Sequence, residues 1–123
     1  MVYLNLSVGN IEETISYYVE KLGIFDYEAG RLVCKYGVDL IIDMLEVGSK
    51  AHNEVFQQDV HVMSSFCIHV GESVDGYELQ IKDRLASNRV KYQEVGNLGG
   101  HCLNFTDPSG NKFSLHAHHS VIK

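Results

Sequence analysis

The sequence contains the same order of short elements twice, which restricts the folds open to it. Alternating apolar and polar residues predict a strand at 2–8, and an apolar stripe at helical spacing predicts a helix at 11–22. Three short strands are expected next, at 24–27, 31–36 and 38–44. The second half repeats strand, helix and three strands at 63–70, 75–87, 90–94, 101–106 and 112–116. Residues 46–60 are polar without a period, so they predict a connecting loop.

Local capping residues support both predicted helices. Asn10 is a candidate N-cap with Glu13 three residues later, and Gly23 would end the first helix. Asp75 is the candidate N-cap of the second helix, and Asn88 is expected to close it in the left-handed conformation.

Composition excludes several classes of function. The chain has 16 acidic and 10 basic residues, a net charge of −6, which argues against a nucleic-acid partner. It has no apolar run of about 20 residues, so no membrane span is predicted. No secretory leader is visible at the start, and the expected location is the cytoplasm. Three cysteines without a paired spacing predict reduced thiols at Cys34, Cys67 and Cys102.

Two segments carry a resemblance to a known family. Residues 6–23 read LSVGNIEETISYYVEKLG and residues 104–115 read NFTDPSGNKFSL. Together with the internal repeat, they resemble the first strand and helix, and the final hairpin, of the vicinal oxygen chelate superfamily. That superfamily includes glyoxalase I, extradiol dioxygenases, and fosfomycin and bleomycin resistance proteins. The resemblance covers nearly the whole chain.

The duplicated order and this resemblance imply an α+β fold. A single glyoxalase/bleomycin-resistance-like domain is expected over residues 1–123, built from two tandem βαβββ modules at about 1–46 and 62–119 and a joining loop. The modules would form curled mixed sheets around a concave pocket, with the helices on the outer face. The resemblance also implies a homodimer, because family members of this size pair their halves across a two-fold axis.

The metal positions implied by the resemblance are substituted in this chain. They fall on Tyr3, Ser65 and Ser114, with Asp43 at the end of the first half. Neutral hydroxyls and a phenol are poor ligands for a catalytic divalent ion. We therefore expect no cofactor; the alternative is one divalent metal ion held by Asp43, His69 and His116, or by the two histidines with Cys67 or Cys102.

Strand alternation from these positions predicts which side chains face the pocket. The expected pocket residues are mostly polar or ionisable: Tyr3, Asn5, Ser7, Asp39, Asp43, Ser65, Cys67, His69, Cys102, Asn104, Ser114 and His116. The two aspartates and the Tyr3 ring would suit a small organic ligand, cationic or hydrogen-bonding. Each aspartate could equally be a solvent-facing strand residue, and the histidines could be hydrogen-bonded pocket residues without a metal. His52, His61 and His101 are expected at the surface.

Three functions are compatible with the sequence. The first is a metal-free small-molecule-binding protein that resembles the bleomycin resistance branch. The second is a metal-dependent lyase, isomerase or dioxygenase with an altered ligand set, so whether the chain is an enzyme stays open. The third is a structural or regulatory domain with a vestigial pocket.

Overall fold

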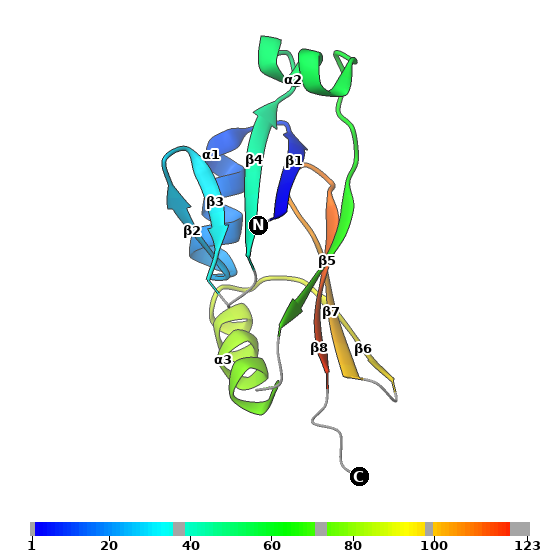
Figure 1. Cartoon of the computed structure of the whole chain (residues 1–123). Helices are drawn as coiled ribbons and strands as arrows, with labels where there is room; N and C mark the ends of the chain where they lie inside the picture. Colours follow the sequence, from blue (N-terminus) through cyan, green and yellow to red (C-terminus); the bar gives the residue numbers. More distant parts are fainter. Residues whose placement is uncertain (1, 36–38, 71–73, 98–99, 119–123) are drawn as a thin grey trace.

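Two four-stranded sheets, built from the two halves of the chain, form the framework of the protein (Figure 1). The computed structural model describes residues 2–35, 39–70, 74–97 and 100–118. Parts of the predicted strands at 31–36 and 38–44, namely Tyr36 and Val38, lie outside this range. No helix of the described chain is long and apolar enough to cross a membrane.

Each sheet contains one parallel and two antiparallel strand pairs. Sheet A has the order β1-β4-β3-β2 and consists of β1 (Val2–Val8), β2 (Phe25–Glu28), β3 (Arg31–Cys34) and β4 (Leu40–Glu46). Sheet B has the order β5-β8-β7-β6 and consists of β5 (Ser65–Val70), β6 (Gln93–Asn97), β7 (Gly100–Thr106) and β8 (Lys112–His118). The two sheets have the same topology, which confirms the predicted α+β fold of two repeated modules.

The first helix is not a uniform α-helix. It comprises α1 (Ile11–Ile15) and the π-helical segment η1 (Ser16–Lys21), where the Leu22 N–H donates to the Tyr17 carbonyl five residues earlier. A π turn holds more residues than an α turn, so neighbouring side chains lie closer to one face. Both Tyr17 and Tyr18 are buried on that face. As predicted, the Asn10 side chain accepts from the Glu13 N–H, and Gly23 follows the helix with a φ of 70°.

Both ends of the second predicted helix differ from the prediction. Helix α3 spans Val74–Ser87, so Asp75 lies within it and is not its N-cap. The left-handed residue is Arg89, with a φ of 54°, and not Asn88. The N–H groups of Arg89 and Val90 donate to α3 carbonyls, and this turn keeps Val90 out of the next strand. Strand β6 therefore begins at Gln93, three residues later than expected.

The predicted loop at 46–60 is wrong because it contains helix α2 (Lys50–Phe56). The Ser49 hydroxyl accepts from the His52 N–H at the start of α2, and Gln57 ends it with a φ of 56°. Only His52 of this helix is fully buried, so the apolar periodicity that identifies a helix is missing.

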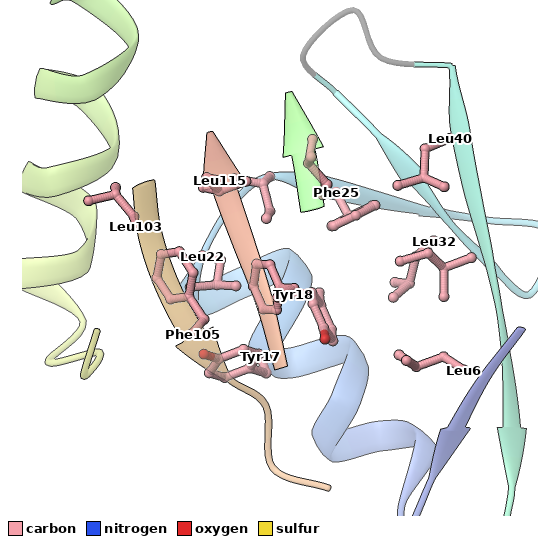
Figure 2. Packing of buried hydrophobic residues seen from close by; sticks show 14 of the residues in the cluster. Leu6, Tyr17, Tyr18, Leu22, Phe25, Leu32, Leu40, Leu103, Phe105 and Leu115 are labelled. Carbon is pink, nitrogen blue, oxygen red and sulfur yellow. The ribbon is translucent and has the colours of Figure 1, made fainter. Parts of the chain in front are cut away.

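One hydrophobic core is shared by both sheets. Figure 2 shows Tyr17 and Tyr18 beside Phe105 and Leu115 of sheet B, with Leu32 of sheet A beyond them. The Tyr18 ring contacts Phe25 on β2 and Phe113 on β8, at centroid distances of 5.6 and 5.2 Å. The apolar residues of alternating strand positions therefore face the helices, as the alternation predicts.

Polar contacts also join the two halves. The Tyr18 hydroxyl donates to Asp107 Oδ2 at 2.8 Å, in the turn between β7 and β8. Asn111, after the same turn, donates through its side chain to the Ser7 carbonyl at 2.8 Å. On the other side, Arg84 of α3 donates to the Glu20 carbonyl at 2.8 Å. These contacts fix one module against the other.

Candidate functional site

The face of sheet B that points away from the core carries a set of polar side chains. We call this set the polar face of sheet B: Ser65, Cys67, Cys102, Asn104, Ser114 and His116. The strand register places Asn104 of β7 and Cys67 of β5 beside Ser114 of β8. The Ser114 hydroxyl donates to Asn104 Oδ1 at 2.6 Å, which fixes both side chains. The side chain of His69 lies outside the described part of the structure.

A cavity of about 670 Å³ opens at one end of this face. Its walls are formed by strand ends and by the segment before β6: Ser65, Lys91, Tyr92, Gln93, Asn104, Phe105, Thr106, Lys112, Phe113 and Ser114. Ligand pockets in proteins have volumes of roughly 300–1,000 Å³, so the cavity is large enough for a small organic molecule. None of these lining residues is acidic, and two are lysines.

The cavity contains three of the predicted pocket residues, namely Ser65, Asn104 and Ser114. The sequence prediction missed Lys91, Tyr92 and Gln93. It placed the strand before β7 at 90–94, whereas β6 spans Gln93–Asn97 and pairs Gln93 with Asn104. With that register, alternation alone would have identified Gln93 as facing the same side as Asn104.

The remaining predicted residues of the first half lie on sheet A, away from this cavity. Tyr3 and Asn5 are exposed on β1, and Asn5 is paired in register with Asp43 of β4. The Arg31 Nε lies 2.7 Å from Asp43 Oδ1, and the Arg31 guanidinium lies 5.5 Å from the centre of the Tyr3 ring. The positively charged Arg31 side chain therefore contacts both the Asp43 carboxylate and the Tyr3 ring. Asp39 precedes β4 and is exposed.

Ser7 is buried, in contrast to the exposed pocket position expected from alternation. Its hydroxyl lies 2.7 Å from His52 Nε2 and accepts from the Val62 N–H at 3.1 Å. His52 is fully buried, its ring packs at a tilted angle against Phe56 with 4.8 Å between centroids, and its Nδ1 lies 3.1 Å from Asn53 Oδ1. The expectation of a surface His52 is thus wrong, because α2 covers this end of β1. His61 is half-buried, with Nε2 3.2 Å from the Ser7 carbonyl.

Two cysteines and a histidine lie on sheet B, next to the cavity-lining pair of Asn104 and Ser114. The sulfur of Cys102 is 2.8 Å from His116 Nδ1, across the pair of β7 and β8. Cys67 is exposed on β5, and desolvation and the nearby Cys102 sulfur raise the pKa of its thiol. No disulfide joins the three cysteines in the described structure.

The residues at the metal positions implied by the sequence resemblance do not suit a divalent ion. Tyr3 supplies an exposed phenol against a guanidinium, and the Ser114 hydroxyl is engaged with Asn104. Asp43, the one carboxylate, is paired with Arg31. Within the described ranges, no three His, Cys, Asp or Glu side chains lie together as a metal site would require. Of the alternative ligand set Asp43, His69 and His116, the first lies on sheet A and the last on sheet B, so the two are on different sheets.

Comparison with known proteins gives matches in structure only. No protein-family model matches the sequence, and no curated protein matches it. The structure is similar to TnmS3, an antibiotic binding protein from Streptomyces sp. CB03234, with a TM-score of 0.68 and 18% identity over 94% of this chain and 93% of that chain. It is also similar to a glyoxalase/bleomycin resistance protein from the same organism (TM-score 0.67, 20% identity, 93% and 96% covered).

An enzyme is among the similar structures as well. Lactoylglutathione lyase from Agrobacterium tumefaciens has a TM-score of 0.65 and 13% identity, with 95% of this chain and 92% of that chain covered. Binding proteins and enzymes thus share this architecture, and the likeness alone does not choose between them. The chain has the glyoxalase/bleomycin resistance/dioxygenase fold, the vicinal oxygen chelate fold that its sequence motifs indicated.

Proposed function

We propose that this protein binds a small organic molecule, without a catalytic metal, in the cavity on the polar face of sheet B. The cavity itself is the observation that supports this proposal most strongly. It combines a volume of about 670 Å³ with hydrogen-bonding side chains and the Tyr92 ring. Such a mixture of apolar surface and a few polar groups is typical of ligand sites. The name of TnmS3, an antibiotic binding protein with the same fold, is consistent with this function.

The charges of the site favour a neutral or anionic ligand. Lys91 and Lys112 line the cavity, and no lining residue is a carboxylate. A cationic ligand, which the aspartates suggested, would have to bind at Asp43 and compete with Arg31. We therefore propose an aromatic or carbonyl-containing ligand with hydrogen-bond acceptors, which Lys91 and Gln93 would bind.

The proposed biological unit is a cytoplasmic homodimer of single-domain chains. The shared core supports one domain over residues 1–123, with modules of about 1–46 and 62–119. The homodimer is carried over from the resemblance, since members of that superfamily of this size pair their halves across a two-fold axis. Light scattering at working concentration tests this, and a monomer would refute it.

Calorimetry on a ligand found by thermal-shift screening tests the binding site. The screen compares neutral, anionic and cationic aromatic compounds, with elemental analysis for bound metal in parallel. Asn104→Ala and Lys91→Gln should each lower the affinity for the selected ligand about tenfold, which is the cost of roughly one charged or buried hydrogen bond. Lys50→Gln is the matched control, because Lys50 lies on α2 and pairs with Glu54. Unchanged affinity in the Asn104 and Lys91 variants, or stoichiometric metal, would refute the proposal.

A further inference from the structure

A cysteine and a histidine form a close pair beside the cavity, outside the set of residues that line it. Cys102 and His116 are direct cross-strand neighbours, and the Cys102 sulfur lies 2.8 Å from His116 Nδ1. At this distance the thiol donates to Nδ1 whenever that nitrogen is unprotonated, and the imidazole can accept the thiol proton. A thiolate formed beside a histidine is the usual arrangement of an activated cysteine nucleophile. Both side chains are half-buried, so small reagents can reach them.

The neighbouring residues indicate which electrophile the pair would meet. Asn104 follows Cys102 by two residues on the same face of β7, which separates the two positions by roughly 7 Å. Because Asn104 Oδ1 accepts from Ser114, its Nδ2 is the end of the amide that can donate to a carbonyl oxygen. A carbonyl compound held at Asn104 would therefore extend toward the Cys102 sulfur.

We propose that Cys102, with His116 as its base, adds covalently to α,β-unsaturated carbonyl compounds that enter the cavity. Cys102 Sγ forms a bond to the β-carbon, and the π electrons of the carbon–carbon double bond move to the carbonyl oxygen to give an enolate. The thiol proton, accepted by His116 Nδ1, is returned to the α-carbon. The net step adds S–H across the double bond, so it needs no oxidant or reductant. This inference rests on the proposed function, since the carbonyl compound must first bind in the cavity.

The reactivity of the three cysteines with N-ethylmaleimide, an α,β-unsaturated imide, tests the proposal. Peptide mapping of the full chain measures the alkylation rate at each thiol at neutral pH. Cys102 should react about tenfold faster than Cys67, although Cys67 is the more exposed thiol. His116→Gln should lower the alkylation rate of Cys102 about tenfold and change that of Cys67 by less than about twofold, since glutamine cannot accept the proton.

Two further measurements separate a chemical role of His116 from a structural one. Free imidazole should restore the Cys102 rate in His116→Ala and leave the Cys67 rate unchanged. Circular dichroism tests whether each His116 variant is folded. If neither variant folds, the alkylation rate of Cys102 relative to that of Cys67 in the unmodified protein decides alone. A Cys102 rate no faster than that of Cys67, or unaffected by His116→Gln, would overturn the proposal.

The covalent step and the proposed binding function can fail independently. If Cys102 is unreactive while Asn104→Ala weakens a calorimetrically measured ligand, the covalent step is refuted and reversible binding stands. If Cys102 reacts rapidly in a His116-dependent manner and no ligand of the screen binds, the binding function is refuted and the reactive thiol stands.

Discussion

Two adjacent tyrosines of η1 provide a direct test of how the modules are joined. The Tyr18 hydroxyl is buried and donates to Asp107 Oδ2 at 2.8 Å, whereas the Tyr17 hydroxyl is buried without a hydrogen-bond partner among the described residues. Replacing either tyrosine by phenylalanine removes one oxygen and keeps the ring in place. The two variants therefore differ only in whether the lost hydroxyl was bonded.

The expected cost follows from the contacts of Asp107. Its carboxylate also accepts from the backbone N–H groups of Ser109 and Asn111, each at 2.9 Å, and from the Asn111 side chain at 3.2 Å. Tyr18→Phe thus removes one hydrogen bond to a charged acceptor and leaves that acceptor with other donors. We expect a loss of about 2 kcal/mol in the free energy of unfolding. For a chain of this length, that corresponds to a Tm lower by roughly 6 to 10 °C.

Urea unfolding of the two variants and the unmodified protein measures the difference. Tyr17→Phe removes an unbonded polar group from the core, so its free energy of unfolding should stay equal or rise by up to about 1 kcal/mol. Equal losses in both variants, or a loss below about 0.5 kcal/mol in Tyr18→Phe, would refute the assigned role of the Tyr18–Asp107 bond.

Three further predictions concern pH, α2 and sheet A. Burial, and secondarily the Asp107 carboxylate, raises the pKa of Tyr17 and Tyr18 above the ordinary value of 10.0, so stability is complete below that pH and falls as the pH rises beyond it. The doubly substituted phenylalanine variant should show a shallower fall in alkaline denaturation, and an equally steep fall would contradict this. His52→Ala should cost about 2 kcal/mol or more in urea unfolding, because a buried and hydrogen-bonded ring that packs against Phe56 is lost; a change below about 0.5 kcal/mol would show that α2 contributes little. Arg31→Ala and Asp43→Asn should each change stability by less than about 1 kcal/mol, since the side chains stay 47% and 27% exposed; a loss above about 2 kcal/mol would count against a solvent-screened pair.

The elements predicted best are those with strong local signals. Strand β1 and the Asn10 cap follow from alternation and from a side chain that bonds a backbone N–H three residues away. The hairpin that the motif at 104–115 indicated also depends on local geometry: at its turn the Asp107 side chain accepts from the Ser109 N–H, and Gly110 has a φ of 91°. These features need no contact from distant parts of the chain.

The errors occur where distant contacts decide. Helix α2 has a polar sequence and one fully buried residue, and that residue is held by Ser7, 45 positions earlier. The π-helical turn at Tyr17 and Tyr18 places both rings in a core formed jointly with Phe105 and Phe113 of the other module. Local propensity contains no information about such partners.

The candidate site was predictable only in part for the same reason. Alternation placed Asn104 and Ser114 on one face, because a pleated strand turns successive side chains to opposite sides. It could not show that Lys91 and Tyr92 complete a cavity beside them, since that depends on how the chain leaves α3.

The sequence by itself determined the duplicated βαβββ order, the Asn10 cap and which strand faces are apolar, because these depend on neighbouring residues. The tertiary structure alone decided that Arg31 pairs with Asp43, that α2 covers Ser7, and that the thiol of Cys102 meets His116. Each of those contacts joins residues on different elements, and only the packing of the whole chain brings them within bonding distance.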